Sequence, residues 1–391
     1  MHQYSAPLTD MLFVMRELAG LEKICTSQRY EAIDSDTVAA VLEEGAKLAA
    51  DVLCPLNAAG DAEGAQLTDS GVQQSPGFKE AYQQYVAGGW STLPCEPEHG
   101  GTGMPDLVAA AISEMWASAN LSFSICPMLS IGAIGAIQKH GSEALQQRFL
   151  GKMISGEWTG TMNLTEPQAG SDLAAVRSRA VPEDDHYRIS GTKIFISWGD
   201  HQMTENIVHL VLARTPDAPD GVKGISMFVV PKFLVNDDGS LGARNDAVCA
   251  SIEHKMGIHG SPTCVMNYGE KDGAIGYLVG EEHKGLKYMF TMMNNARLHV
   301  GIEGVALGEA AYQHALAYAR DRVQGAPLGA QEAATIIHHG DVRRMLMQMR
   351  ALTEAARAIN YTTSAAMDRA ACGDAEAQRR VEFMTPIAKA W

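Results

Sequence analysis

The sequence predicts an α+β protein of several domains, with an N-terminal all-α domain at residues 1–158, a middle antiparallel β domain at 159–280 and a C-terminal helical bundle at 281–391. Three observations predict this order. A chain of 391 residues is long enough for two or three domains. Its 46% hydrophobic and 20% charged residues are typical of globular proteins. The hydrophobic spacing also changes from helical to strand-like and back along the chain.

The N-terminal domain is predicted from segments rich in Ala, Leu, Glu and Gln. Residues 36–52 (DTVAAVLEEGAKLAADV) have helical spacing and begin at Asp36, a residue type that caps helices. Residues 93–105 interrupt the helices, because three prolines and three glycines predict a turn there. No Gly-Lys-Ser/Thr follows these glycines, so the segment is not a phosphate-binding loop.

The middle domain is predicted from short runs rich in β-branched and aromatic residues. These runs are separated by turn-forming segments such as 216–221 and 236–240. No segment of helical length lies between the runs, so we expect antiparallel pairing in a small sandwich or barrel rather than a Rossmann sheet. The runs are residues 187–190, 193–197, 206–212, 225–230 and 263–268.

The C-terminal bundle is predicted from apolar residues that recur at i, i+3, i+4 and i+7 within 286–293 and again within 342–349. Gly301, Gly304 and Gly308 lie near one face of the first helix. Each glycine costs about 1 kcal/mol of helix propensity relative to alanine. We therefore expect this face to be a place where another helix packs closely.

Charge and composition exclude several classes of function. The formal net charge of −15 argues against binding to nucleic acid or anionic membranes, although it leaves a phosphate-bearing cofactor possible. No apolar run reaches about 18 residues, and the start has no basic and apolar leader pattern, so we expect a cytoplasmic protein without membrane insertion. The seven cysteines contain no C-x-x-C pair and the histidines no H-E-x-x-H, so no metal site is predicted.

The densest group of chemically useful residues is 156–172 (GEWTGTMNLTEPQAGSD), which places hydroxyls, an amide and glycines around Pro167. Such a stretch can direct backbone N–H groups and hydroxyls at a polar, planar or phosphorylated ligand. An ordinary loop with Asx and Ser/Thr turns explains the same composition equally well. These residues alone leave both interpretations open.

The wider pattern resembles the acyl-CoA dehydrogenase family over almost the whole chain. The resemblance implies the family's fold, a helical domain, a β domain and a helical bundle, which agrees with the spacing. Each matching motif is weak alone, but their order is specific. The motifs are residues 97–103 (PEHGGTG), 140–150 (HGSEALQQRFL), 155–158 (SGEW), 164–172 (LTEPQAGSD), 193–197 (KIFIS), 255–263 (KMGIHGSPT) and 320–325 (RDRVQG).

The resemblance also implies bound FAD between the β domain and the C-terminal helices. Phe195 stands where the family usually has a tryptophan, and Ser171 and Arg297 match substrate-binding positions. Arg322 and Gln324 match positions that reach FAD across a subunit interface, which implies a homodimer or homotetramer. Judged alone, each of these residues is better explained as strand core, a strand-end hydroxyl or a solvated charge. The implied cofactor-binding residues are Met162, Asn163, Leu164, Thr165, Gly170, Ser171, Phe195, Ile196, Ser197, Arg322 and Gln324.

The activity implied by the resemblance is α,β-dehydrogenation of an acyl-CoA thioester. A carboxylate removes the α proton, the flavin accepts the β hydride, and an electron-transferring flavoprotein takes the electrons. In most of the family the base follows a helix that resembles residues 385–390, so we expect it beyond Trp391, in a longer protein. In a minority of relatives the base is on the helix after the β domain, but Ala296 occupies that position here. Glu303, about two turns later, is not assigned as the base.

Residues 4–14 and 257–263 resemble the subgroup that contains 3-(methylthio)propanoyl-CoA dehydrogenases. This implies a short or medium acyl-CoA substrate, with 3-(methylthio)propanoyl-CoA favoured, and a role in dimethylsulfoniopropionate degradation. Two alternatives stay open. One is a related flavoprotein with a nucleic-acid-binding or stress-response role, and the other is an acyl-CoA oxidase that releases hydrogen peroxide.

Overall fold

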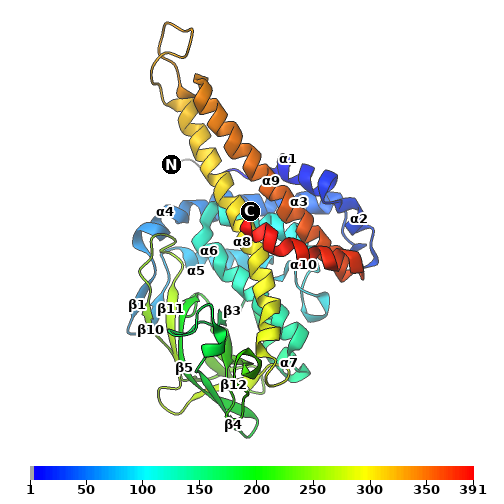
Figure 1. Ribbon diagram of the computed structural model, residues 1–391, viewed down its shortest axis with the longest axis vertical. Coiled ribbons are helices and arrows are strands. Elements are labelled where there is room, and N and C mark those ends of the chain that lie inside the picture. The colour runs from blue at the N-terminus through cyan, green and yellow to red at the C-terminus, as the bar shows by residue number, and fades with distance from the viewer. Residues whose placement is uncertain (1–3) are drawn as a thin grey trace. The chain divides into compact units, whose positions relative to one another are not determined.

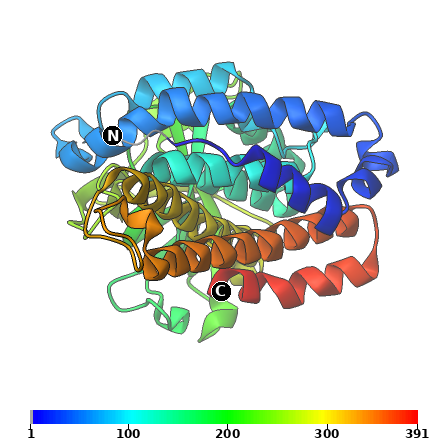
Figure 2. The ribbon, with the colours of Figure 1, turned by 90° about the horizontal axis from the view of Figure 1, so that it is seen from above.

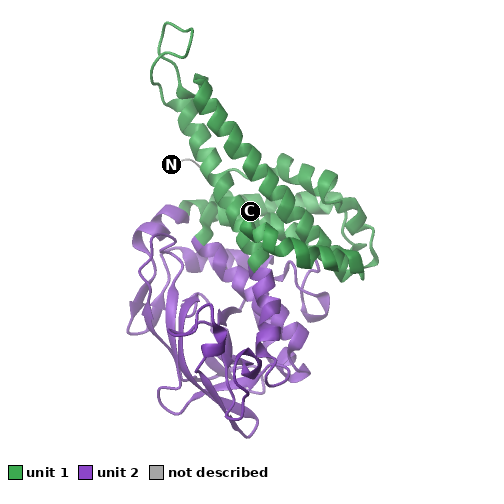
Figure 3. Cartoon of the chain, viewed as in Figure 1, with its two compact units in different colours: residues 1–55, 104–121, 297–391 green, residues 56–103, 122–296 purple. Residues whose placement is uncertain are grey.

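The computed structural model describes residues 4–391, and its elements follow the predicted order of helices, strands and helices (Figure 1). The chain forms two compact units (Figure 3). Unit 1 contains the described residues up to Pro55 together with 104–121 and 297–391, and unit 2 contains 56–103 and 122–296. Two of the four boundaries between the units fall inside long helices, α6 (Asp106–His140) and α8 (Gly285–Asp321).

The N-terminal segments are helical, as predicted. The helix expected at 36–52 is α3 (Ser35–Lys47), which continues as a π-helical turn at Leu48–Leu53. Its cap is Asp34 rather than Asp36, because the Asp34 carboxylate accepts the N–H of Thr37 at 2.7 Å. The other elements before the β domain are α1 (Leu8–Phe13), α2 (Leu21–Cys25), α4 (Cys54–Glu63), the hairpin β1 (Gln66–Thr68) and β2 (Gly71–Gln73), α5 (Phe78–Ala87) and α7 (Glu143–Ile154).

The β domain is an eight-stranded sheet with the order β10-β11-β5-β12-β7-β6-β3, and β4 also pairs with β5. All pairs are antiparallel except β3 with β6, which the sequence analysis did not predict. The chain between these two strands contains β4 and β5 and is long enough to return in the same direction. The strands are β3 (Trp158–Asn163), β4 (Arg179–Glu183), β5 (His186–Ser197), β6 (Asn206–Ala213), β7 (Ser226–Pro231), β10 (Ala247–Ile252), β11 (Thr263–Tyr268) and β12 (Ala274–Leu278). A separate two-stranded sheet pairs β8 (Phe233–Val235) with β9 (Leu241–Arg244).

The core of the β domain lies on the inner face of this sheet. It includes Ile189, Ile196, Val211, Phe228 and Val230, which are all at most 1% exposed. Every residue of β6 is buried. This explains why its sequence does not alternate between apolar and polar residues, because a strand covered on both faces has no exposed side.

The C-terminal part of unit 1 consists of α8 from Arg297 onward, α9 (Gly340–Ala371) and α10 (Ala375–Ala390), and α9 and α10 lie side by side (Figure 2). The expected close packing along α8 is confirmed at two of the three glycines. A Cβ at Gly301 would lie 2.5 Å from the carbonyl oxygen of Ala388, and one at Gly308 would lie 2.8 Å from Thr353 Oγ1. A Cβ at Gly304 would meet no atom within 4 Å.

Unit 1 also contains a buried ionic network on Arg357. The guanidinium Nη2 donates to Glu114 Oε1 at 2.7 Å and to Glu309 Oε2 at 2.8 Å, and Nε adds a bond to Glu114 Oε1 at 2.9 Å. Tyr361 donates its hydroxyl to Glu114 Oε2 at 2.7 Å. Arg357, Glu114 and Tyr361 are 0% exposed. The network therefore connects α6, α8 and α9 by charge-assisted hydrogen bonds.

By length and composition α6 could cross a bilayer, because its most apolar 18-residue window has a mean hydropathy of 1.6. However, 72% of that window is buried inside the protein. A core helix has the same composition, and burial on this scale is what a core helix shows.

Candidate functional site

Two segments predicted to contact a flavin lie side by side in unit 2. Thr161 Oγ1 donates to the carbonyl oxygen of Ser197 at 2.8 Å, and the Ile194 N–H donates to the carbonyl oxygen of Thr165 at 2.9 Å. The end of β3 and the loop after it are thereby fixed against the end of β5. The structure thus brings together the predicted residues at 162–165 and 195–197.

Phe195 occupies a β-bulge at the end of β5. Ile196 pairs with Cys264 and Lys193 with Met266, so β5 has one more residue between these pairs than β11. Phe195 has φ +58°, a left-handed conformation that is unusual for a bulky residue and costs about 1–3 kcal/mol. Its side chain is 59% exposed, whereas that of Ile196 is 1% exposed. The bulge therefore directs the aromatic ring away from the core, and Phe195 is not plain strand core.

A buried ion pair holds the segment at residues 164–172, the flavin loop, against β5. Lys193 Nζ donates to Glu166 Oε1 at 2.8 Å and to the carbonyl oxygen of Leu164 at 2.9 Å. Glu166 also accepts the N–H of Arg177 at 2.7 Å and the hydroxyl of Ser178 at 2.6 Å. Lys193 is 0% and Glu166 3% exposed. The pair therefore connects residues 164–166 and residues 177–178 to β5.

The protonation of this pair follows from its surroundings. Burial opposes ionisation of Glu166, but the charge of Lys193 and the hydrogen bonds from Lys193 and Ser178 outweigh it and lower the carboxyl pKa to about 2. Burial lowers the pKa of Lys193 to about 8 against the attraction of Glu166. Both groups are consequently charged at pH 7.

The other predicted residues of unit 2 differ in exposure. Met162, Thr165 and Ser197 are half-buried, and Gly170 and Ser171 lie on the exposed part of the loop. Three more are buried, namely Asn163, Leu164 and Ile196.

Asn163 is turned into the β domain. Its Oδ1 accepts the hydroxyl of Tyr268 at 2.8 Å, while its Nδ2 has no hydrogen-bond partner among residues 4–391. A buried unpaired amide is costly unless a ligand or water completes it. Asn163, one of the residues that the sequence analysis assigned to the cofactor, thus lacks a partner for one donor.

The remaining predicted residues belong to unit 1. Arg322 and Gln324 follow the end of α8, are exposed, and are brought together by a hydrogen bond from Arg322 Nη2 to Gln324 Oε1 at 3.0 Å. The carbonyl oxygen of Gln324 also lies 2.9 Å from His339 Nε2. Arg297 is half-buried within α8. The roles implied for these three residues stay predictions.

Two residues with shifted pKa values lie on the same helix. Burial raises the pKa of Glu303 to about 7 and lowers that of His299 to about 4. Neither was predicted as a site residue. In residues 4–391, no group of three His, Cys, Asp or Glu side chains could hold a metal ion.

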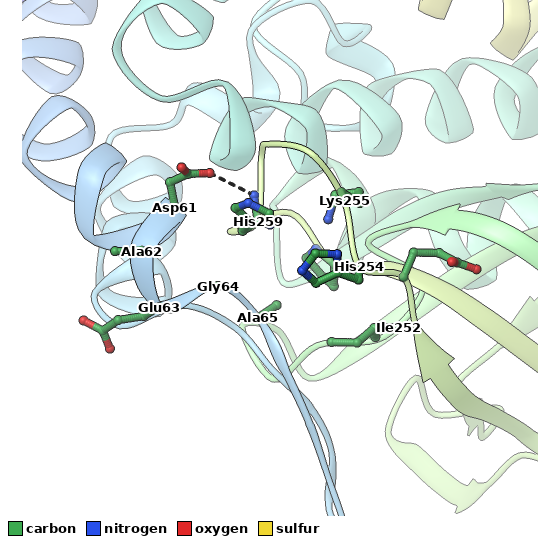
Figure 4. Close-up of a pocket in the computed structure, with 11 residues that line it drawn as sticks. Asp61, Ala62, Glu63, Gly64, Ala65, Ile252, His254, Lys255 and His259 are labelled. Carbon is green, nitrogen blue, oxygen red and sulfur yellow. Dashed lines mark hydrogen bonds between the residues drawn. The ribbon is translucent and has the colours of Figure 1, made fainter.

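The 255–263 motif lines a different cavity of about 410 Å³, between the end of α4 and the loop that connects β10 and β11 (Figure 4). The His259 N–H donates to Asp61 Oδ1 at 3.3 Å, and the rings of His254 and His259 are 6.1 Å apart. Figure 4 shows Glu63 pointing away from the two histidines. This cavity mixes charges of both signs, because Lys255 and three carboxylates line it, and it does not define one ligand chemistry.

The residues at the ends of β3 and β5 fit a flavin. Phe195 supplies an exposed aromatic face, and the half-buried Thr165 and Ser197 of the two adjoining segments supply hydroxyls. The exposed Gly170 and Ser171 offer backbone N–H groups and a hydroxyl of the kind that binds phosphates. The fit rests on the chemistry of these groups and on the outward direction of the aromatic ring.

Comparisons with known proteins identify the family of the chain. Residues 35–157, 161–269 and 283–381 match the models of the N-terminal, middle and C-terminal domains of acyl-CoA dehydrogenase. A 3-methylmercaptopropionyl-CoA dehydrogenase of Ruegeria pomeroyi is 51% identical over 99% of this chain and 66% of the relative. A butyryl-CoA dehydrogenase of Syntrophomonas wolfei is 37% identical over 100% of this chain and 67% of the relative.

The fold is shared with solved structures. The butyryl-CoA dehydrogenase from Megasphaera elsdenii superposes with a TM-score of 0.68, at 23% identity over 90% of this chain and 88% of that one. The chain spans about two thirds of the length of the two curated relatives. With the three domain models matched in order along its length, the chain belongs to the acyl-CoA dehydrogenase family.

Proposed function

We propose that this chain is the FAD-binding and acyl-CoA-binding part of a dehydrogenase that converts an acyl-CoA to the 2-enoyl-CoA. The observation that carries the proposal is the exposed Phe195 on its strained bulge, in a strand whose neighbouring Ile194 is hydrogen-bonded to Thr165. Strain of this kind persists where the surroundings enforce it, and it is concentrated at binding sites. The favoured substrate is 3-(methylthio)propanoyl-CoA, since the relative with 51% identity is named for the same acyl group.

Each residue has a proposed role. The ring of Phe195 packs on the isoalloxazine, and the hydroxyls of Thr165 and Ser197 bond its polar edge. Gly170 and Ser171 meet phosphate groups of FAD or of CoA. The flavin supplies the hydride acceptor.

Further proposals concern parts outside unit 2. Arg322 and Gln324 contact FAD of a second subunit in a homodimer or homotetramer, and Arg297 contacts substrate. An electron-transferring flavoprotein takes the electrons. The proton-abstracting carboxylate stays a prediction for a segment beyond Trp391.

The test is flavin binding followed by reduction. We expect the purified protein to be yellow, or to gain flavin absorbance bands when FAD is added, and the longer protein to bleach anaerobically with 3-(methylthio)propanoyl-CoA. A protein that takes up no FAD contradicts the proposal. Release of hydrogen peroxide during turnover identifies the oxidase alternative instead.

Replacing Phe195 with glycine separates stability from flavin binding. Glycine adopts the left-handed conformation without strain, and the exposed ring buries little surface, so we expect the free energy of unfolding of the apoprotein to change by less than about 1 kcal/mol. FAD affinity should fall by about tenfold or more, because the stacking surface is lost. Fluorescence titration with FAD and urea denaturation measure the two effects. The control Val181→Gly removes an exposed side chain from β4 and should leave FAD affinity unchanged.

A further inference from the structure

Two bulky residues at and just after the end of β5 have left-handed backbone conformations. Phe195 has φ +58° and Trp198 has φ +52°. This conformation is strained for residues with a large side chain, and it persists only where the surrounding structure enforces it. The 195–198 segment also contains Ser197, to which the proposed function gives a bond to the flavin. The path of this backbone is therefore set by contacts that outweigh the strain.

The two aromatic side chains lie in opposite environments. Phe195 is 59% exposed, whereas Trp198 is 1% exposed. The indole of Trp198 stacks on the ring of Phe78, with ring centroids 6.3 Å apart and planes at 25°, and meets the His201 ring edge-on at 5.6 Å. Its Nε1 donates to the carbonyl oxygen of Ser122 at 3.2 Å, so the one polar group of the side chain is satisfied. Trp198 thus anchors the segment in the core.

The partners of the indole belong to two helices of unit 2. Phe78 is the first residue of α5, and Ser122 belongs to the part of α6 within this unit. Phe78 in turn packs edge-on against Phe123 of α6, with ring centroids 5.8 Å apart. Phe78 and Phe123 are both 0% exposed. The packing of α5 against α6 therefore determines where Trp198 lies, and it fixes the end of the strand from the helical side.

The peptide group between Ser197 and Trp198 is bonded through both of its polar atoms. The Trp198 N–H donates to the carbonyl oxygen of Pro262 at 2.8 Å, and the Ser197 carbonyl oxygen accepts the hydroxyl of Thr161 at 2.8 Å. Ser197 also pairs with Thr263 of β11. The backbone that carries the Ser197 side chain is thus fixed, and its orientation sets the direction of that side chain.

We propose that Trp198 is a positioning residue of the flavin site. Its buried indole holds the 195–198 segment in the strained path from which Ser197 and Phe195 reach the cofactor. Burial of an aromatic side chain of this size gains more than one strained residue costs, so the anchored path is the stable one. Binding groups must be held to within about 0.5 Å by neighbours that are themselves locked by packing and hydrogen bonds, and Trp198 meets both conditions. This inference rests on the proposed function, because it concerns the same flavin.

The test measures FAD binding after the anchor is weakened. In Trp198→Phe a ring remains, but the donor to Ser122 and part of the stacking surface are lost. We expect the Kd for FAD, measured by fluorescence titration, to rise about tenfold or more, because a small displacement of a binding group is costly. The visible circular dichroism of the flavin, measured at saturating FAD, should also change. The matched control Trp116→Phe alters a buried tryptophan of unit 1 and should change neither quantity.

A double-mutant cycle separates positioning from a general loss of stability. Ser197→Ala is made in the wild type and in Trp198→Phe. We expect Ser197→Ala to weaken FAD binding in the wild type but to change the Kd by less than about twofold in Trp198→Phe, where the hydroxyl is already displaced. A purely structural role of Trp198 gives additive effects on the Kd instead, and additivity overturns the inference.

All titrations use protein that far-ultraviolet circular dichroism shows to be folded. If Trp198→Phe yields no folded protein, Phe78→Leu weakens the same anchor without altering the 195–198 segment, and it is combined with Ser197→Ala in the same way. A variant with a weakened anchor that binds FAD with wild-type affinity and dichroism overturns the inference alone. A wild type that takes up no FAD overturns both the inference and the proposed function.

Discussion

Replacing Arg357 with methionine is expected to lower the free energy of unfolding of unit 1 by about 3–5 kcal/mol. The substitution leaves the carboxylates of Glu114 and Glu309 without the cation that lies 2.7 Å and 2.8 Å from them. Both carboxylates are buried, so water cannot replace the lost hydrogen bonds. Methionine fills much of the volume of arginine, so the loss reports charge rather than a cavity.

Urea denaturation at pH 7 measures this effect. The control is Arg350→Met, which breaks the exposed pair with Glu354 and should change stability by less than about 1 kcal/mol. The triple variant Glu114→Gln/Glu309→Gln/Arg357→Met removes all three charges and should recover part of the loss. A variant at Arg357 that is as stable as the control would show that the network contributes nothing to unit 1.

Replacing Lys193 with methionine is the second large effect, and we expect a loss of about 3–5 kcal/mol from unit 2. Glu166 then stays buried among its donors from Arg177 and Ser178 without a counter-charge. FAD affinity should fall as well, since Lys193 also holds the carbonyl of Leu164 in the flavin loop. The double variant Glu166→Gln/Lys193→Met is the control and should be more stable than Lys193→Met alone.

The same pair predicts a pH dependence. The pKa of Glu166 is about 2 in the folded protein and 4.5 as the ordinary value. A carboxyl with a lowered folded pKa stabilises the protein fully above its unfolded pKa, and this contribution disappears as the pH falls from about 4.5 to about 2. Acid unfolding of unit 2 followed by circular dichroism should therefore be less steep in Glu166→Gln than in the wild type. Identical acid profiles would exclude a role for this carboxyl.

The order of helical and β segments could be predicted because hydrophobic spacing is a local property. The runs at 206–212 and 263–268 became β6 and β11 almost residue for residue. The strand β4 was missed because it contains Pro182 and exposes most of its residues, so it has little hydrophobic signal. The parallel pairing of β3 and β6 depends on tertiary contacts that no local pattern encodes.

The candidate site, too, could be predicted only in part from the sequence. The motifs at 164–172 and 193–197 indicated which segments matter, and the structure places them together. The sequence could not show that Phe195 is in a bulge, because the extra residue exists only relative to the register of β11. The pairing of Glu166 with Lys193 was also missed. A lysine directly before the apolar residues 194–196 was its only local signal.

The bulge at Phe195 makes this position tolerant of other aromatic residues. Because the backbone, and not neighbouring core side chains, sets the direction of this ring, the residue can be exchanged without repacking the interior. Tryptophan, tyrosine or histidine could be introduced here to tune the absorption spectrum or the redox behaviour of a bound chromophore, while the surrounding β domain keeps its melting temperature.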